Sequence, residues 1–252
     1  MKGLQKPASS QSPVESLTVK PKLVWAVGQL LILQTRLTEA HSLVIVSRMS
    51  DAPHVSPDPT RFEKAIRRFD DENARDPNFE TVNGQREPRE LVYARWLSEW
   101  VLRLTPEPSE ALRLAARCQH ICRWMIPRSD YPMTRPGYLK WRADLKAFHA
   151  KRAGEILTEF GFPTETIARV ASLNLKKNLA SDSECQMIED ALCLVFLQHQ
   201  FSDLAAKTSE EKMINALRKS WQKMSPAGRA LALQLPFADR EKRLLDLALT
   251  NS

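Results

Sequence analysis

The chain has 252 residues, of which 43% are hydrophobic and 27% are charged. This balance leaves enough apolar residues for one sizeable core and is too polar for a membrane protein. With only 7 glycines, the sequence offers little of the turn chemistry that hairpin-based folds require. We therefore expect an all-α fold, built as a compact multi-helix bundle.

The formal net charge of +7 is unevenly distributed along the chain. Residues 1–48 hold six basic and two acidic residues, which leaves a net charge of only +3 for residues 49–252. Because the basic excess lies largely outside the predicted bundle, nucleic acid is not expected as a partner.

Residues 1–57 differ from the rest in being rich in Ser, Pro and Val, and we interpret them as a disordered or weakly structured extension. Their apolar run, Leu23–Leu33, is too short to span a bilayer. Two interpretations stay open. The extension is a mitochondrial leader, since it is basic and poor in acids, or it precedes a working start at Met49 in a cytoplasmic protein.

The four cysteines fall in predicted helices at positions Cys118, Cys122, Cys185 and Cys193. None of them forms a Cys-x-x-Cys pair, the spacing that cysteine-based metal sites commonly use. The pattern is typical of reduced, buried cysteines in an intracellular protein.

Prolines, glycines and helix-capping residues divide the remaining chain into a helical domain over residues 58–236 and a C-terminal helix or tail over residues 237–252. Asp58 and Pro59 are expected as the N-cap and first residue of the first helix. After a loop through Asn83 and Gly84, apolar spacing predicts a second helix, Pro88 to Leu104, and a third, Glu110 to Ile126. Further helices are expected at residues 137–160, 163–179 and 183–201, from a capping box of Thr208 and Glu211, and from Ser225 with Pro226.

The predicted third helix carries a polar stripe on an otherwise apolar surface. At helical spacing Arg113, Arg117, His120 and Trp124 fall on one face, with Arg123 beside them. The stripe is either a solvated basic face or, because the helix is otherwise apolar, the wall of a pocket that supplies partner charges.

The predicted sixth helix contains two carboxylates, Glu189 and Asp190, within an apolar run. Burying carboxylates costs several kcal/mol unless they are paired or bind a metal. They are therefore either in ion pairs with an arginine of the third helix or part of a ligand or catalytic site.

Two histidines join this acidic pair in the candidate site. His149 lies at the edge of an apolar face of the fourth helix, where a lone histidine is commonly a satisfied core group. If the helices converge, however, His120, His149 and Asp190 supply two nitrogen ligands and one oxygen ligand, a set that suits a divalent transition metal.

The loop after the third helix is dense in arginines and aromatic residues, a composition that suits a small anionic ligand. Its alternative role is a loop pinned over the bundle by ion pairs. Lysines at the end of the fifth helix face the same pocket or are exposed. The candidate ligand-binding residues are Arg117, Arg123, Trp124, Arg128, Asp130, Tyr131, Arg135, Arg142, Lys176 and Lys177, and the candidate catalytic residues are His120, His149, Asp190 and Glu189.

Four strings, at residues 117–124, 126–133, 148–155 and 189–197, occur in order and resemble the DUF4202 family of uncharacterised proteins. The resemblance covers about residues 60–235. Some relatives carry the label glutamyl-tRNA synthetase, and Lys223-Met224-Ser225 resembles part of the KMSKS loop of those enzymes. Because the chain has no HIGH-type motif and no strand-helix alternation, synthetase activity is not expected.

The order of elements is also similar to the HD-domain superfamily of metal-dependent phosphohydrolases. This resemblance implies an HD-domain-like bundle in which His120 matches the dyad histidine, His149 the later histidine and Asp190 the closing aspartate. It places Glu90 or Tyr93 in the region of the first histidine.

The sequence departs from the HD pattern at two points. Ile121 replaces the dyad aspartate, and the second helix has no histidine. Our hypothesis is a pocket between the third, fourth and sixth helices that binds a phosphorylated or carboxylated anion. If it is an enzyme, we expect a hydrolase whose metal activates water. The alternative is a noncatalytic binding or scaffold protein on a degenerate HD-like fold.

Overall fold

The computed structural model of the chain describes residues 60–250. The predicted N-terminal extension, the start at Met49 and the helix start at Asp58 and Pro59 lie outside this range. Within it the elements are α1 (Arg61–Asn73), β1 (Phe79–Val82), β2 (Gln85–Pro88), α2 (Arg89–Leu104), α3 (Glu110–Cys118), η1 (Arg123–Met125), η2 (Arg128–Asp130), α4 (Arg135–Glu159), α5 (Thr164–Leu175), α6 (Ser183–Val195), η3 (Phe196–Gln200), α7 (Phe201–Lys207), α8 (Glu210–Lys223), α9 (Pro226–Ala232) and α10 (Asp239–Leu249).

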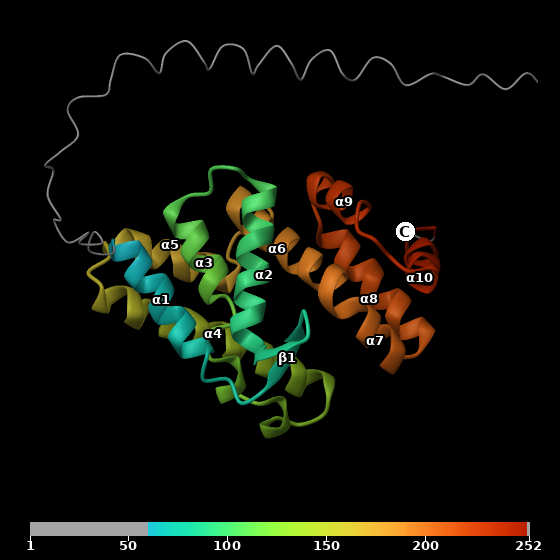
Figure 1. Cartoon of the computed structure of the whole chain (residues 1–252), viewed down its shortest axis with the longest axis horizontal. Coiled ribbons are helices and arrows are strands. Elements are labelled where there is room, and N and C mark those ends of the chain that lie inside the picture. The colour runs from blue at the N-terminus through green and yellow to red at the C-terminus, as the bar shows by residue number, and fades with distance from the viewer. Residues whose placement is uncertain (1–59, 251–252) are drawn as a thin grey trace, which may run out of the picture. The chain divides into compact units, whose positions relative to one another are not determined.

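Helices dominate the described residues, which confirms the predicted all-α class (Figure 1). The strands β1 and β2 form a small antiparallel hairpin that the sequence analysis treated as a loop. Asn83 and Gly84 both have positive φ, 51° and 79°, as a tight two-residue hairpin turn requires. The Asn-Gly pair was therefore a real turn signal, although one hairpin leaves the fold class unchanged.

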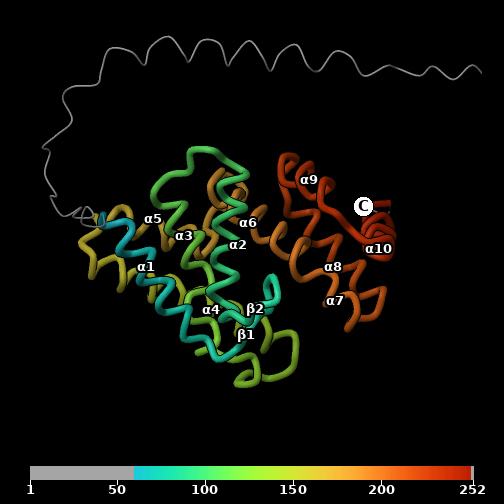
Figure 2. Tube along the Cα trace, in the orientation of Figure 1, coloured from blue at the N-terminus to red at the C-terminus, as the bar shows by residue number. Residues whose placement is uncertain are grey.

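Two groups of helices flank α6 in the trace of the chain. The helices α1 to α5 lie on one side and α7 to α10 on the other, with α6 running between them (Figures 1 and 2). A single buried cluster of apolar side chains includes members from both groups, among them Phe69, Leu97, Leu157, Leu194 and Leu217. The last helix, α10, packs against α8 and adds Leu244 and Ala248 to this cluster, so the packed unit extends through residues expected as a C-terminal helix or tail.

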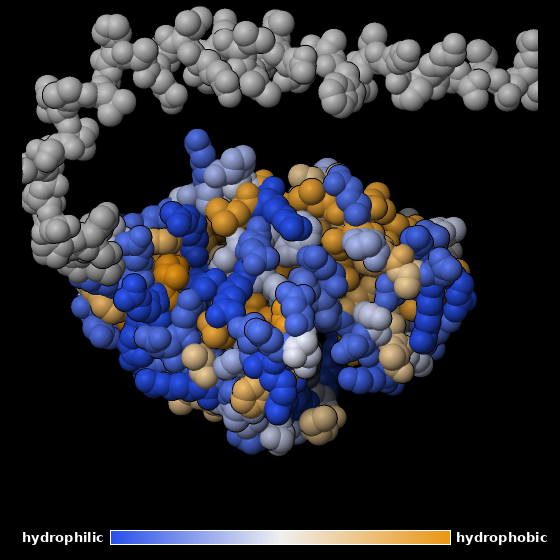
Figure 3. Space-filling view, viewed as in Figure 1, coloured by the Kyte–Doolittle hydropathy of each residue, from blue (hydrophilic) through white to orange (hydrophobic). Residues whose placement is uncertain are grey.

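The two groups also differ on the face shown in Figure 3. Hydrophilic side chains cover most of this face over the N-terminal helices, whereas apolar side chains gather where Figure 1 places α8 and α9. Leu233, which follows α9, is 61% exposed. No helix among residues 60–250 is long and apolar enough to cross a membrane.

Several predicted helices are shorter than the sequence suggested. The third ends at Cys118 instead of Ile126, and the fifth ends at Leu175, where Lys176 takes a left-handed conformation. The sixth passes at Val195 into the π-helix η3 and then into α7. The helix α8 has Ser209 at its N-cap position with no side-chain capping bond, so the expected capping box of Thr208 and Glu211 is not formed. The helix α9 begins at Ser225 and Pro226 as predicted.

The early end of α3 has a visible cause in the end of α1. Cys122 adopts a left-handed conformation with φ of 52°, which is unfavourable for a residue with a side chain. Its backbone N–H donates to Asn73 Oδ1 at 3.1 Å, and its Sγ donates to Glu72 Oε2 at 3.3 Å. Because residues 119–122 turn instead of continuing the helix, the predicted stripe of Arg113, Arg117, His120 and Trp124 is not formed.

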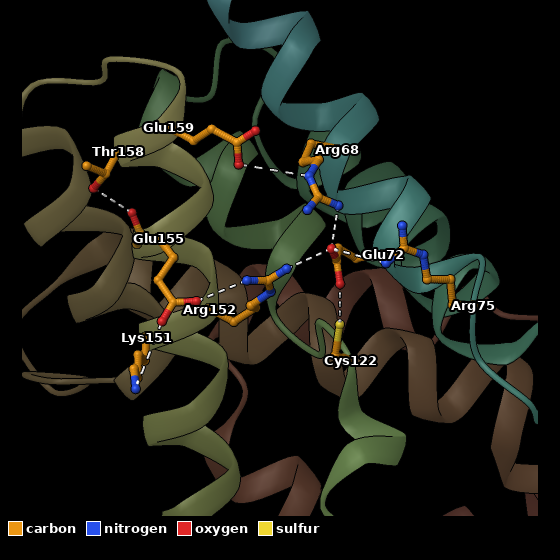
Figure 4. A network of polar contacts seen from close by, with 10 residues as sticks. Arg68, Glu72, Arg75, Cys122, Lys151, Arg152, Glu155, Thr158 and Glu159 are labelled. Atoms are coloured by element: carbon orange, nitrogen blue, oxygen red, sulfur yellow. Dashed lines mark hydrogen bonds and ion pairs between the residues drawn. The ribbon is translucent and has the colours of Figure 1, made fainter.

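Glu72 is the centre of a buried network that holds this turn (Figure 4). Its carboxylate binds Arg68 and accepts from Arg152 Nη2 at 2.7 Å, while Arg75 lies 3.8 Å away. Burial raises the pKa of Glu72, but hydrogen bonds from Cys122 and Arg152 outweigh it and lower the pKa below the ordinary value. The carboxylate is therefore ionised and joins α1, α4 and the turn.

We expect Glu72→Ala to lower the free energy of unfolding by about 2 kcal/mol, because it removes the buried acceptor of two half-buried arginines and of Cys122. Urea denaturation at pH 7 measures the change. The matched control is Glu155→Ala, since Glu155 also binds Arg152 but is largely exposed, and its loss should cost less than about 1 kcal/mol. Equal losses in the two variants would contradict this role of Glu72.

Candidate functional site

A cavity of about 420 Å³ lies among α2, α4, α6 and the turn after α3. This volume is within the range of roughly 300–1,000 Å³ that is typical of small-molecule sites. The polar side chains that line it are Arg89, Glu90, Tyr93, Gln119, His120, Arg123, Arg142, Lys146, His149, Lys176, Glu189, Gln200 and Ser220.

Regular helical spacing places several of these groups on the cavity wall. On α4 the lining residues are Arg142, Leu145, Lys146 and His149, which recur at intervals of three, one and three residues. Residues at such spacing share one face of a helix. Glu189, Leu192, Cys193 and Phe196 repeat the same pattern from α6 into η3. Each helix therefore presents one continuous stripe to the cavity.

The turn after α3 supplies the third wall. His120 stacks on Tyr93 of α2, with ring centroids 4.3 Å apart and an interplanar angle of 17°. Arg123 lies over the Trp141 ring, 4.9 Å from its centroid. Burial and the nearby charge of Arg123 hold the pKa of His120 well below its ordinary value. His120 is therefore neutral at pH 7.

His149 is fixed by the same turn. Its Nδ1 lies 2.7 Å from the backbone carbonyl oxygen of Ile121, so Nδ1 donates this hydrogen bond. Burial, with a smaller contribution from His120, lowers the pKa of His149 to about 3. The ring is thus neutral at pH 7, and its Nε2 is a buried atom with no hydrogen-bond partner among the described residues.

Glu90 sits in the first turn of α2, where its backbone N–H donates to Asp76 Oδ2 at 3.0 Å. Its Oε2 lies 3.5 Å from His120 Nδ1, and its Oε1 lies 3.8 Å from Arg123 Nε. Burial raises the pKa of Glu90 to about 7, although Arg123 opposes the rise. Near neutral pH this carboxyl group therefore exchanges readily between its protonated and ionised forms.

The cavity has an excess of positive charge. Its lining includes five cationic side chains, Arg89, Arg123, Arg142, Lys146 and Lys176, and two carboxylates, Glu90 and Glu189. Glu189 is neutralised by Lys176 and by Lys223, whose Nζ lies 3.2 Å from Oε1. In residues 60–250, neither Arg142 nor Lys146 has a carboxylate within 4.0 Å.

The structure brings together six of the residues proposed from the sequence, namely His120, Arg123, Arg142, His149, Lys176 and Glu189. The others lie elsewhere. Arg117 forms a two-pronged ion pair with Asp70, Arg128 donates to the backbone oxygens of Tyr131 and Pro132, and Tyr131 donates to Asp144. Trp124 packs against the core, whereas Asp130, Arg135 and Lys177 are exposed.

Asp190 does not join the two histidines. Its Oδ1 accepts from the Ser225 backbone N–H at 2.8 Å and from Gln186 at 3.0 Å, and its Oδ2 accepts from Ser225 Oγ at 2.5 Å. The aspartate therefore anchors the start of α9. Within residues 60–250 no group of three or more His, Cys, Asp or Glu side chains is placed to hold a metal ion. The expected set of His120, His149 and Asp190 thus does not fit a metal centre.

Glu90 and Lys146 are absent from the site residues proposed from the sequence, although the HD resemblance places Glu90 or Tyr93 in the region of the first histidine. Lys146 carried a usable signal, because it stands one turn before His149 and one turn after Arg142 on α4. Glu90 carried a weaker signal, since a glutamate in the first turn of a helix is ordinarily explained by the helix dipole. Only the fold of residues 119–123 reveals that it faces His120.

The family model described as a domain of unknown function, DUF4202, matches residues 63–245. The chain belongs to the DUF4202 family. The resemblance proposed from four sequence strings is thereby confirmed. No curated protein and no solved structure matches the chain, so the similarity to HD-domain phosphohydrolases stays a prediction.

The raised pKa of Glu90 makes the stability of this DUF4202 protein depend on pH. Because the pKa of Glu90 is about 7 in the folded state and near 4.5 when unfolded, the folded state binds the extra proton. Its contribution to the free energy of unfolding is therefore full below pH 4.5 and is lost as the pH rises through 7. Glutamine does not titrate, so Glu90→Gln keeps its stability where wild type loses it. Between pH 5 and pH 8 the free energy of unfolding of Glu90→Gln, relative to that of wild type, should therefore rise by on the order of 3 kcal/mol.

Urea denaturation of both proteins at the two pH values tests this prediction. Comparison with wild type cancels the opposing titration of the buried histidines, which both proteins share. Glu99→Gln, on the exposed face of α2, is the matched control and should alter stability by less than about 0.5 kcal/mol at either pH. A Glu90→Gln effect that does not vary with pH would show that Glu90 is ionised throughout.

Proposed function

We propose that the cavity of this DUF4202 protein binds a small anionic ligand, phosphorylated or carboxylated. The observation that carries the proposal is the pair of cations on α4, Arg142 and Lys146, which line the cavity without a carboxylate partner among the described residues. Cationic side chains that converge on a concave site favour phosphate or carboxylate groups.

The charge balance of the cavity supports the same proposal. Burial and repulsion from Arg142 lower the pKa of Lys146, and the charge of Glu189 opposes only part of this effect. Glu189 is also engaged by Lys176 and Lys223, so the cavity keeps an excess of positive charge. A bound anion relieves the remaining repulsion.

A noncatalytic binding role fits the described residues better than a metal-dependent hydrolase does. The hydrolase of the HD resemblance requires an aspartate beside two histidines, and Asp190 instead binds Ser225 and Gln186. In addition, Ile121 occupies the position of the dyad aspartate, and its backbone oxygen accepts from His149. Binding of an anion needs neither the closing aspartate nor the dyad aspartate of the HD pattern.

Calorimetric titration of the full-length protein at low salt tests the proposed function. The probes are sn-glycerol 3-phosphate, propyl phosphate, malate and succinate. We expect at least one of them to bind with 1:1 stoichiometry. Reversing two charges in Arg142→Glu/Lys146→Glu should weaken this binding at least tenfold, a change of about 1.4 kcal/mol.

The matched control is Arg135→Glu/Lys151→Glu, which reverses two charges on the same helix at exposed positions outside the cavity. It should change the dissociation constant by no more than about twofold. If no probe binds wild type, or if both double variants weaken binding equally, the cavity is not the anion site.

Metal content distinguishes the binding role from the hydrolase. Because Asp190 is engaged elsewhere, we expect protein purified without chelator to hold less than one equivalent of Mn, Fe, Co, Ni or Zn by elemental analysis. A stoichiometric metal that disappears in His120→Ala would instead favour the metal-dependent hydrolase.

A further inference from the structure

Unpaired acceptor atoms accompany the cations of the cavity. Six buried side-chain atoms in residues 60–250 lack a hydrogen-bond partner, and three of them belong to cavity-lining residues: Glu90 Oε2, Gln119 Oε1 and His149 Nε2. These residues are 6%, 4% and 2% exposed. A buried polar atom without a partner costs free energy, so three such atoms on residues that line one cavity favour a ligand that supplies their partners.

The chemistry of His149 specifies what the ligand offers there. A backbone carbonyl oxygen only accepts hydrogen bonds, so the 2.7 Å contact with Ile121 requires the proton to be on Nδ1. In the neutral ring Nε2 then has a lone pair and no proton. The ligand group that binds Nε2 must therefore donate a hydrogen bond.

Gln119 leads to the same requirement by a separate route. Its Nε2 donates to the backbone oxygen of Asn174 at 3.4 Å, which assigns the remaining atom, Oε1, as an acceptor. Glu90 is less restrictive, because its Oε2 accepts a hydrogen bond when ionised and donates one when protonated. Two of the three unpaired atoms are thus acceptors.

We propose, building on the proposed function, that the ligand is an anion that also carries O–H or N–H donors, which bind His149 Nε2 and Gln119 Oε1 while the cations hold the charged group. A hydroxylated phosphate ester or a hydroxy acid meets this description. An anion without donors leaves both buried acceptors unpaired, which weakens its binding.

Matched ligand pairs test the inference without any substitution. In the titrations, sn-glycerol 3-phosphate is compared with propyl phosphate, and malate with succinate, since the members of each pair share a chain length and differ in hydroxyl groups. In at least one pair we expect the hydroxylated member to bind about tenfold more tightly. If both members bind equally in each pair that binds, the inference fails while the proposed function stands. If none of the four binds, both fail.

A variant of His149 tests whether its Nε2 accepts the hydrogen bond from the ligand hydroxyl. His149→Phe keeps a ring of similar size and removes both Nε2 and the Nδ1–H that binds Ile121. The readout is therefore the ratio of the two affinities within the variant, and the preference for the hydroxylated anion should fall to within about twofold. The matched control is His199→Phe, because His199 stacks on Trp96 and does not line the cavity. A preference that survives His149→Phe assigns the hydroxyl to another group and overturns the role of His149.

An NMR measurement on the wild-type protein tests the inference even if His149→Phe does not fold. Long-range ¹H–¹⁵N correlation distinguishes the two histidine tautomers. We expect His149 to be the Nδ1–H tautomer, with the Nε2 resonance moving to lower frequency when sn-glycerol 3-phosphate is added. An Nε2–H tautomer, or an Nε2 resonance unchanged at saturation, would overturn the inference.

Discussion

The site depends on one constraint, the left-handed turn at Cys122 that ends α3. The turn is held by Glu72 and Asn73, the last two residues of α1, which bind the thiol and backbone N–H of Cys122. Were α3 to continue to Ile126, the backbone oxygen of Ile121 would be used within the helix. Instead it fixes His149, and the same turn stacks His120 on Tyr93. The ionic network around the buried Glu72 thus determines the geometry of the cavity.

The cavity combines two features that are separately unfavourable in a folded protein. Arg142 and Lys146 bring positive charge together without a nearby carboxylate, and His149 and Gln119 present buried acceptors without donors. Stability alone would favour apolar side chains at the buried positions of His149 and Gln119. A site that keeps both features is suited to a ligand with negative charge and hydrogen-bond donors, which compensates both at once.

Much of the fold could be predicted from the sequence because it depends on local spacing. Proline, serine and apolar periodicity gave the start of α9 and the whole of α2 within a residue. The end of α3 could not be predicted, because its cause is contact with Glu72, about 50 residues earlier in the chain. The same distinction between local spacing and long-range contact holds for the site residues. The sequence indicated His120 and His149, but the placement of Asp190 depends on Ser225 of a distant helix start.

A crystal structure of the full-length protein with sn-glycerol 3-phosphate tests the account most directly. We expect the phosphate to lie beside Arg142 and Lys146, with a hydroxyl oxygen within hydrogen-bond distance of His149 Nε2. We also expect His149 Nδ1 to keep its contact with Ile121. A phosphate bound only outside the cavity, or a protein group that occupies Nε2 in the complex, would contradict it.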